Sequence, residues 1–150
     1  PKDMNTLRSL AATSRLELNE RSTASFPSLH AALQSLLLNS DVLLALPDTE
    51  IYNAMTIRNI LLATYRNKVP LVGFSAAYVK AGALCAVYRT PAQMADQALK
   101  LIYGFAETRT LPPPQYAKEF EVSVNEQVAR SLGLNIRSAS QVRGEIGAAP

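Results

Sequence analysis

The feature that most constrains this chain is the alternation of helical and extended apolar patterns along almost its whole length. Helical spacing of apolar residues recurs between short apolar runs, and few residues separate one pattern from the next. Strands that alternate with helices imply a mostly parallel sheet covered by helices on both faces. We therefore predict an α/β fold with three layers, α/β/α, built on a mostly parallel, Rossmann-like sheet.

Five short segments have the patterns expected of strands. Leu16 and Leu18 alternate with polar neighbours, which is typical of a half-buried strand. Residues 42–46 are continuously apolar and too few for a helix, so we predict a strand buried on both faces. The complete set of predicted strands is 16–18, 42–46, 71–74, 84–88 and 120–124.

Helix signals lie between these segments. Thr90, Pro91 and Gln93 form a capping box with proline at the first helical position, which predicts a helix through Phe105. Asn125 is predicted to cap another helix that ends at Gly133. The other predicted helices are 4–11 with Asp3 as cap, one opened by Ser25 and Pro27 that carries Leu29, Ala32, Leu33, Leu36 and Leu37, 53–67 with Met55 on its apolar side, 76–81, and a short one capped by Ser138 and Gln141.

Composition excludes several classes of protein. A chain of 150 residues, 48% of them hydrophobic, can bury a full core. The formal charge of +3 is spread along the chain without a basic cluster, so we expect no nucleic-acid partner. Cys85 is the only cysteine, so it cannot form an internal disulfide, and its apolar surroundings predict a small buried side chain.

Candidate binding residues follow the predicted strands, because open parallel sheets bind ligands beyond the carboxyl ends of their strands. Asp48 either accepts hydrogen bonds from an ammonium or hydroxyl group or caps the following turn. Ser75 either donates to a ligand carboxylate or caps the next helix. Tyr52 and Tyr78 either pack against a flat ligand or belong to the core.

The sequence offers no catalytic constellation. The only histidine, His30, lies on a predicted helix far from these loops, which argues against a Ser-His-Asp arrangement. The sequence has neither clustered Cys or His ligands for a metal nor a glycine-rich phosphate-binding motif. We therefore predict that the protein is not an enzyme and uses neither a cofactor nor a metal.

Several motifs, in their order and spacing, resemble one family. They are residues 41–48 (DVLLALPD), 63–70 (ATYRNKVP), 71–75 (LVGFS), 78–84 (YVKAGAL), 87–91 (VYRTP) and 120–134 (FEVSVNEQVARSLGL). Over residues 41–136 the chain resembles the ABC-transporter substrate-binding proteins with a type I periplasmic-binding fold. Some members of that group bind tryptophan and other aromatic amino acids.

The resemblance implies one lobe of a two-lobed protein. It implies a ligand-binding lobe over residues 1–136, in which 90–111 would cross to the other lobe, and a short C-terminal helix and tail over 137–150. Ala76 and Ala77 stand where many relatives place an acidic residue beside the serine, which weighs against an ammonium contact there. The implied ligand-binding residues are Asp48, Thr49, Asn53, Ser75, Ala76 and Tyr78.

The implied function is that of an extracytoplasmic solute-binding component of an ABC uptake transporter, with an aromatic or other amino acid among the candidate ligands. The partners would be the small molecule and the permease subunits, in the periplasm or another extracytoplasmic compartment, with the signal peptide outside this chain. Apolar surface left open by a missing lobe favours a homodimer. Two alternatives stay open: a cytoplasmic ligand-sensing regulatory domain of the same fold, and a small α/β enzyme with an unrecognised site.

Overall fold

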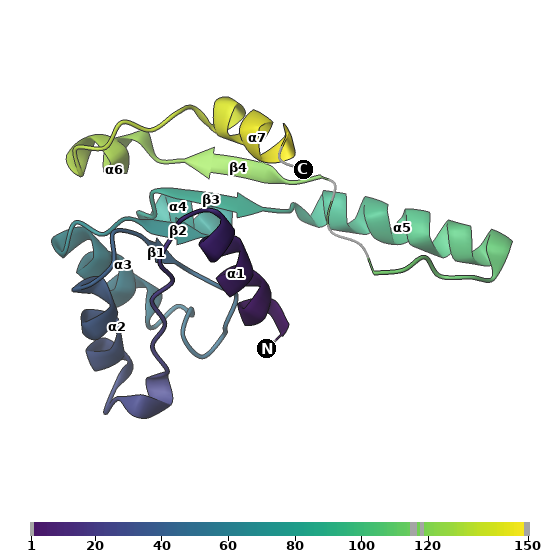
Figure 1. Cartoon of the computed structure of the whole chain (residues 1–150). Helices are drawn as coiled ribbons and strands as arrows, with labels where there is room; N and C mark the ends of the chain where they lie inside the picture. Colours follow the sequence, from purple (N-terminus) through teal and green to yellow (C-terminus); the bar gives the residue numbers. More distant parts are fainter. Residues whose placement is uncertain (1, 115–116, 118, 149–150) are drawn as a thin grey trace.

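A computed structural model describes residues 2–114, 117 and 119–148, and its centre is a four-stranded sheet in the order β1-β2-β3-β4 (Figure 1). The strands are β1 (Leu43–Leu44), β2 (Leu71–Gly73), β3 (Cys85–Tyr88) and β4 (Glu121–Val124). The first three run parallel, and β4 is antiparallel to β3. The predicted α/β fold with a mostly parallel sheet is confirmed.

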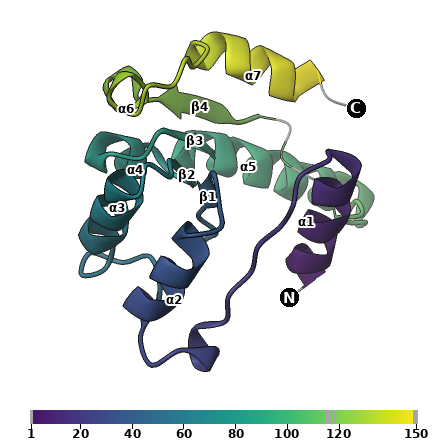
Figure 2. The same cartoon turned by 60° about the vertical axis from the view of Figure 1, so that its left-hand side comes forward.

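Helices separate the strands along the chain. In both views α2 and α3 lie together on one side, α7 lies beside β4, and α1 stands apart (Figures 1 and 2). The helical elements are α1 (Lys2–Thr13), the 3₁₀ turn η1 (Thr23–Ser25), α2 (Leu29–Leu37), α3 (Ile57–Arg66), α4 (Ala76–Ala81), α5 (Pro91–Thr108), α6 (Glu126–Ser131) and α7 (Ala139–Ala148).

The core lies where α2 and α3 pack against one face of the sheet. Leu71 of the inner strand β2 is 2% exposed, which identifies this contact as the centre of the core. Burying a leucine side chain contributes about 1.5–3 kcal/mol, so this cluster is the main stabilising element of the body. Its buried members are Leu33, Leu37, Leu43, Ala45, Ile60, Leu61, Ala63, Val69, Leu71 and Ala83.

Local capping signals in the sequence predicted helix ends well. The Thr90 hydroxyl accepts from the backbone N–H of Gln93 at 3.2 Å, and the Gln93 side chain accepts from the backbone N–H of Thr90 at 3.0 Å. Asn125 Oδ1 accepts from the N–H of Val128 at 3.0 Å at the start of α6. Gly133 follows α6 with a φ of +71°, a conformation that favours glycine. The predicted link between Ser138 and Gln141 is also present at the start of α7.

Two predicted helix starts are wrong because polar side chains hold the chain in turns there. Ser25 lies in η1, and α2 begins at its cap Ser28, whose hydroxyl accepts from the N–H of Ala31. Asn53 Oδ1 accepts from the backbone N–H of Met55 and of the residue after it, which delays α3 to Ile57. Met55 is consequently 87% exposed instead of lying on the apolar side of the helix.

The N-terminal region differs most from the sequence prediction. Asp3 lies inside α1 and therefore does not cap it. Residues 16–18 do not form a strand, and Leu16 is 67% exposed. The alternation of Leu16 and Leu18 indicates two faces but supplies no pairing partner, and a strand exists only where a neighbour accepts its backbone hydrogen bonds.

The prediction that residues 42–46 are buried on both faces is also wrong. Leu43 and Ala45 point into the core, whereas Val42 and Leu44 are 51% and 46% exposed. β1 is the edge strand of the sheet, and only its face toward α2 and α3 is covered. The continuous apolar run over residues 42–46 therefore corresponds to a strand with one face covered by helices and one face exposed.

Helix α5 projects away from the sheet (Figure 1). None of its residues is buried, although Leu99, Ile102 and Tyr103 are large and apolar. Pro112, Pro113 and Pro114 lie on the extended return toward β4, as the proline run predicts.

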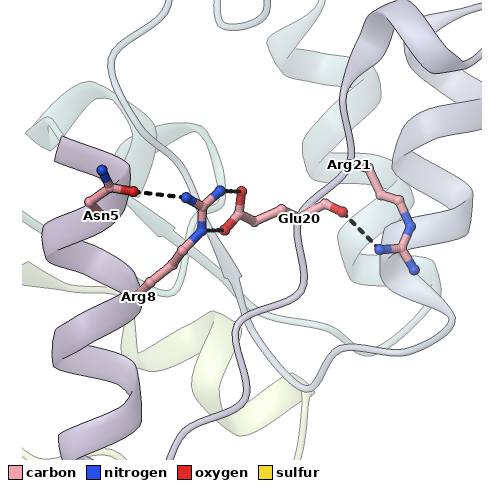
Figure 3. A network of polar contacts seen from close by, with 4 residues as sticks. All are labelled: Asn5, Arg8, Glu20 and Arg21. Carbon is pink, nitrogen blue, oxygen red and sulfur yellow. Dashed lines mark hydrogen bonds and ion pairs between the residues drawn. The ribbon is translucent and has the colours of Figure 1, made fainter. Parts of the chain in front are cut away.

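A polar network attaches α1 to the extended segment that follows it (Figure 3). Arg8 Nε and one terminal nitrogen each donate to a carboxylate oxygen of Glu20 at 2.7 Å, and Arg8 also donates to Asn5 Oδ1 at 2.9 Å. Arg21 donates to the backbone oxygen of Glu20 and to the hydroxyl of Ser35 on α2. The network thus links α1 through Glu20 to the helical layer.

The Arg8–Glu20 contact predicts an acid-sensitive attachment of α1. Hydrogen bonds from Arg8 lower the pKa of the Glu20 carboxyl. A lowered pKa in the folded state means that the stabilisation is present above the ordinary glutamate range and is lost as the pH falls through the lowered pKa. We expect hydrogen-exchange protection of α1 to fall on acidification, and Glu20→Gln to lower that protection already at neutral pH. Glu17→Gln is the control, and equal protection in all three chains would contradict the expectation.

Candidate functional site

The carboxyl ends of β1, β2 and β3 lie at one edge of the sheet because these strands are parallel. Each end continues into a loop that carries polar side chains. Asp48 follows β1, Ser75 follows β2, and Arg89 follows β3. The predicted ligand-binding residues lie on or next to the loops after β1 and β2, and the structure brings these two loops together.

An open hollow of about 600 Å³ lies between these two loops. Its lining includes two acidic residues, Asp48 and Glu50, and two aromatic residues, Tyr52 and Phe74. A wall of this kind suits a small molecule with a flat apolar part and a polar group. The residues that line it are Pro47, Asp48, Thr49, Glu50, Tyr52 and Phe74.

Asp48 organises the loop that forms the polar side of the hollow. Its Oδ1 accepts from the backbone N–H of Glu50 at 2.9 Å and of Ile51 at 3.1 Å. This is the turn-capping role that the sequence allowed. Within the described part of the chain no hydrogen bond engages Oδ2, and Asp48 is exposed, so the same carboxylate can also accept from a bound ligand.

Asn53 shapes the loop from its other end. Its side-chain amide donates to the backbone oxygens of Thr49 and Glu50 at 3.0 and 3.1 Å. Its Oδ1 accepts from the N–H groups of Met55 and Thr56. Because these bonds use both ends of the amide, Asn53 fixes the position of Thr49 and does not line the hollow itself.

Three aromatic rings form a cluster behind the hollow. The ring centroids of Phe74 and Tyr78 are 4.6 Å apart, and Tyr52 packs edge-on at 5.8 Å from Phe74 and 6.2 Å from Tyr78. The Tyr78 hydroxyl donates to the backbone oxygen of Tyr52 at 3.4 Å. These contacts hold two loops together, so Tyr78 supports the wall of the hollow from behind.

Burial, with smaller contributions from neighbouring Tyr78 and the charge of Asp48, raises the pKa of Tyr52 to about 12. The Tyr52 hydroxyl is therefore protonated throughout the neutral range. It presents a neutral polar group beside the Asp48 carboxylate, and the only full charges on the lining residues are negative.

Ser75 and Ala76 stand at the start of α4. Ser75 is the N-cap residue by position, with extended backbone, but its side chain makes no capping hydrogen bond. The alternative in which Ser75 caps the helix is thus not realised by its side chain, and the half-buried hydroxyl remains able to donate to a ligand. Ala76 is the first residue of α4 and is half-buried next to the aromatic cluster.

Other chemically reactive side chains lie outside this hollow. His30 is exposed on α2, as predicted. Cys85 is half-buried on β3, where burial raises the pKa of its thiol and disfavours the reactive thiolate. In residues 2–114, 117 and 119–148, no group of three His, Cys, Asp or Glu side chains is arranged to hold a metal ion. The helices described there are all too short or too polar to cross a membrane.

The comparison with family models identifies the chain. Residues 1–144 match the model described as ABC transporter substrate binding protein. The chain belongs to this family. Substrate-binding family members hold a solute for a transporter, which agrees with a hollow at strand ends and with the predicted resemblance.

Three solved structures resemble this substrate-binding family member. A conserved domain protein from Vibrio cholerae O1 biovar El Tor is 26% identical, with a TM-score of 0.67 over 95% of this chain and 48% of its own. An ABC domain from Streptococcus pneumoniae in complex with L-Trp is 16% identical, with a TM-score of 0.66 over 94% and 48%. An open, ligand-free substrate-binding protein with adhesive properties from Clostridium difficile is 17% identical, with a TM-score of 0.65 over 90% and 46%.

The chain therefore spans about half the length of these solved structures. The structures that are 16% and 17% identical to this chain share its fold, and the likeness indicates no more than that. A search of curated proteins finds no match.

Sequence reasoning missed two residues of the hollow in this family member. Phe74 was assigned to the end of a strand, yet its position directly before Ser75 places it at the same edge of the sheet. Glu50 follows Asp48 by two residues and shares its loop. In both cases the signal was the distance in sequence from a strand end.

Gly73 is predicted to be essential for the aromatic cluster. A Cβ at this position would lie 2.9 Å from the Cβ of Tyr78, so Gly73→Ala must displace the Tyr78 ring. We expect a loss of about 1–3 kcal/mol in unfolding free energy and a changed near-ultraviolet tyrosine signal. Gly144→Ala, where nothing lies within 4 Å, is the matched control and is expected to stabilise α7 slightly. An unchanged Tyr signal in Gly73→Ala would contradict this role.

Proposed function

We propose that this chain is the ligand-binding lobe of an extracytoplasmic solute-binding protein that delivers a small molecule to the permease subunits of an ABC uptake transporter. The observation that carries the proposal is the open hollow at the carboxyl ends of the parallel strands, in a member of the substrate-binding family. Hinge closure of two lobes over a ligand produces the form that a transporter recognises. Holding a solute in this way needs no catalysis.

We propose an aromatic or other amino acid as the ligand class. The apolar side of the hollow, Tyr52 and Phe74 backed by Tyr78, suits a flat side chain that packs edge-on or offset. Asp48 is available for an ammonium group and Ser75 for a carboxylate. The related fold from Streptococcus pneumoniae was solved with L-Trp, which supports testing this class first.

The division of the chain is part of the proposal. Residues 1–136 form the ligand-binding lobe and 137–150 the C-terminal helix and tail, of which 149–150 lie outside the described residues. Segment 90–111 reaches toward a second lobe.

Helix α5, about 27 Å long, offers a broad apolar face for contact with that lobe. On this face Met94, Leu99, Ile102, Tyr103 and Phe105 are between 41% and 67% exposed.

Among the described residues, the chain's own return segment leaves this face exposed. Leu111 and Pro112 share a hollow with Lys100, Leu101 and Gly104, which helical spacing places on another side of α5. The apolar face is thus left for another body, and the second lobe of a two-lobed protein has the position to cover it. In its absence the same face favours a homodimer.

Removing the charge of Asp48 tests the ligand site. Asp48→Asn keeps the oxygen that accepts from Glu50 and Ile51, so the loop is expected to persist. In the two-lobed protein, we expect binding of L-tryptophan or L-tyrosine to weaken by about 1–3 kcal/mol in calorimetry. Asp41→Asn, an exposed aspartate outside the hollow, is the control. Unchanged affinity would remove Asp48 from the site, and turnover of either compound would favour an enzyme.

A charge on α5 tests the role of its apolar face. Ile102 is 61% exposed, so Ile102→Glu is expected to leave the fold of the body intact. We expect the chain to self-associate in analytical ultracentrifugation and Ile102→Glu to shift it toward the monomer, because a buried unpaired charge is costly. Lys100→Glu on the polar side is the matched control. If the two-lobed protein stays monomeric with and without Ile102→Glu, the result supports a second lobe that covers the apolar face of α5.

A further inference from the structure

Two stretches of chain join α5 to the sheet, and they meet at one point. Tyr88, the last residue of β3, pairs with Glu121, the first residue of β4. The outgoing chain passes from Tyr88 into α5, and the returning chain enters the sheet at Glu121 (Figure 1). We call this point, where Tyr88 pairs with Glu121, the joint. The joint therefore sets the direction in which α5 leaves the sheet.

Gln93 has two roles at the joint. Its Oε1 accepts from the backbone N–H of Thr90 at 3.0 Å and completes the capping box of α5. Its Nε2 donates to Glu121 Oε1 at 2.8 Å, a contact that the capping box does not need. The second bond connects the first turn of the projecting helix directly to the returning strand.

Charged side chains from the neighbouring elements complete the joint. Arg143 of α7 lies 3.7 Å from the other carboxylate oxygen of Glu121. Arg89 donates to the backbone oxygen of Gln93 at 3.0 Å, while its buried Nε has no hydrogen-bond partner among the described residues. A buried donor without a partner is unfavourable, so this arrangement of the joint carries an energetic cost.

We propose that the Gln93–Glu121 hydrogen bond is a latch that sets the angle between the ligand-binding body and α5. Breaking it frees α5 to turn about the joint while its cap stays closed. The proposal depends on the proposed function in one respect, namely that α5 contacts the second lobe. In that protein the latch biases the angle between the lobes, and Gln93 is a positioning residue that does not touch the ligand.

Gln93→Glu separates the latch from the cap. Glutamate at this position still completes a capping box with Thr90, but it cannot donate to Glu121 and repels it. Spin labels at Glu107→Cys on α5 and Lys80→Cys on α4 report the angle by pulsed electron paramagnetic resonance. The background carries Cys85→Ala and Ile102→Glu, the second of which disfavours self-association through α5. We expect one narrow distance in the parent chain and loss of that single peak in Gln93→Glu, with helix content unchanged by circular dichroism.

Two further variants keep the test decisive. Gln93→Glu combined with Glu121→Gln restores a donor–acceptor pair in the reversed direction, and we expect the narrow distance to return. Gln97→Glu, one turn along α5, adds the same charge without this contact and is expected to change nothing. A narrow, unshifted distance in Gln93→Glu, or no recovery in the double variant, would overturn the latch.

The labelled distance needs no ligand, so it distinguishes the latch from the proposed function. If the distance responds as expected but the two-lobed protein binds neither L-tryptophan nor L-tyrosine, the latch stands and the proposal of an aromatic amino-acid ligand fails. If the two-lobed protein binds L-tryptophan or L-tyrosine and the labelled distance does not change in Gln93→Glu, the latch fails and the proposed function stands.

Discussion

Packing of one face of a short parallel sheet against α2 and α3 holds the rest of this molecule in place. The strands are only two to four residues long, so their backbone hydrogen bonds alone are too few to fix the sheet. Leu71, at 2% exposure, and the leucines of α2 and α3 supply the burial that does so. Because that packing aligns β1, β2 and β3, their polar ends lie together at one edge. The hollow and the root of α5 both depend on this alignment.

The sequence predicted correctly those helices whose ends are set by interactions between residues close in sequence. Helix α4 has the predicted bounds. Helices α5 and α6 begin at their predicted caps, because the side chains of Thr90 and Asn125 accept from free N–H groups in the first turn. The prediction failed where a pattern requires a partner from elsewhere. Leu16 and Leu18 alternate but meet no neighbouring strand, and Val42 and Leu44 face away from the only helices that cover β1.

The site was predictable in position more than in detail. The rule that parallel strands gather their carboxyl ends placed Asp48 and Ser75 correctly at one edge. Side-chain roles depend on distances that a sequence does not contain. Asn53 is predicted to contact the ligand, and in this structure its amide makes hydrogen bonds inside the loop. Phe74 and the close approach of Gly73 to Tyr78 became visible only once the strands were aligned in space.

The open hollow and the exposed apolar face of α5 both agree with the proposed second lobe. A pocket that holds a small molecule tightly encloses most of its surface, whereas this hollow is open to solvent. Helix α5 has an apolar face that no described residue buries. Since α5 starts at the carboxyl end of β3, it leaves the body from the same edge that carries the hollow. In the proposed two-lobed protein, a lobe that packs on α5 lies at the edge that carries the hollow, so one joint governs both contacts.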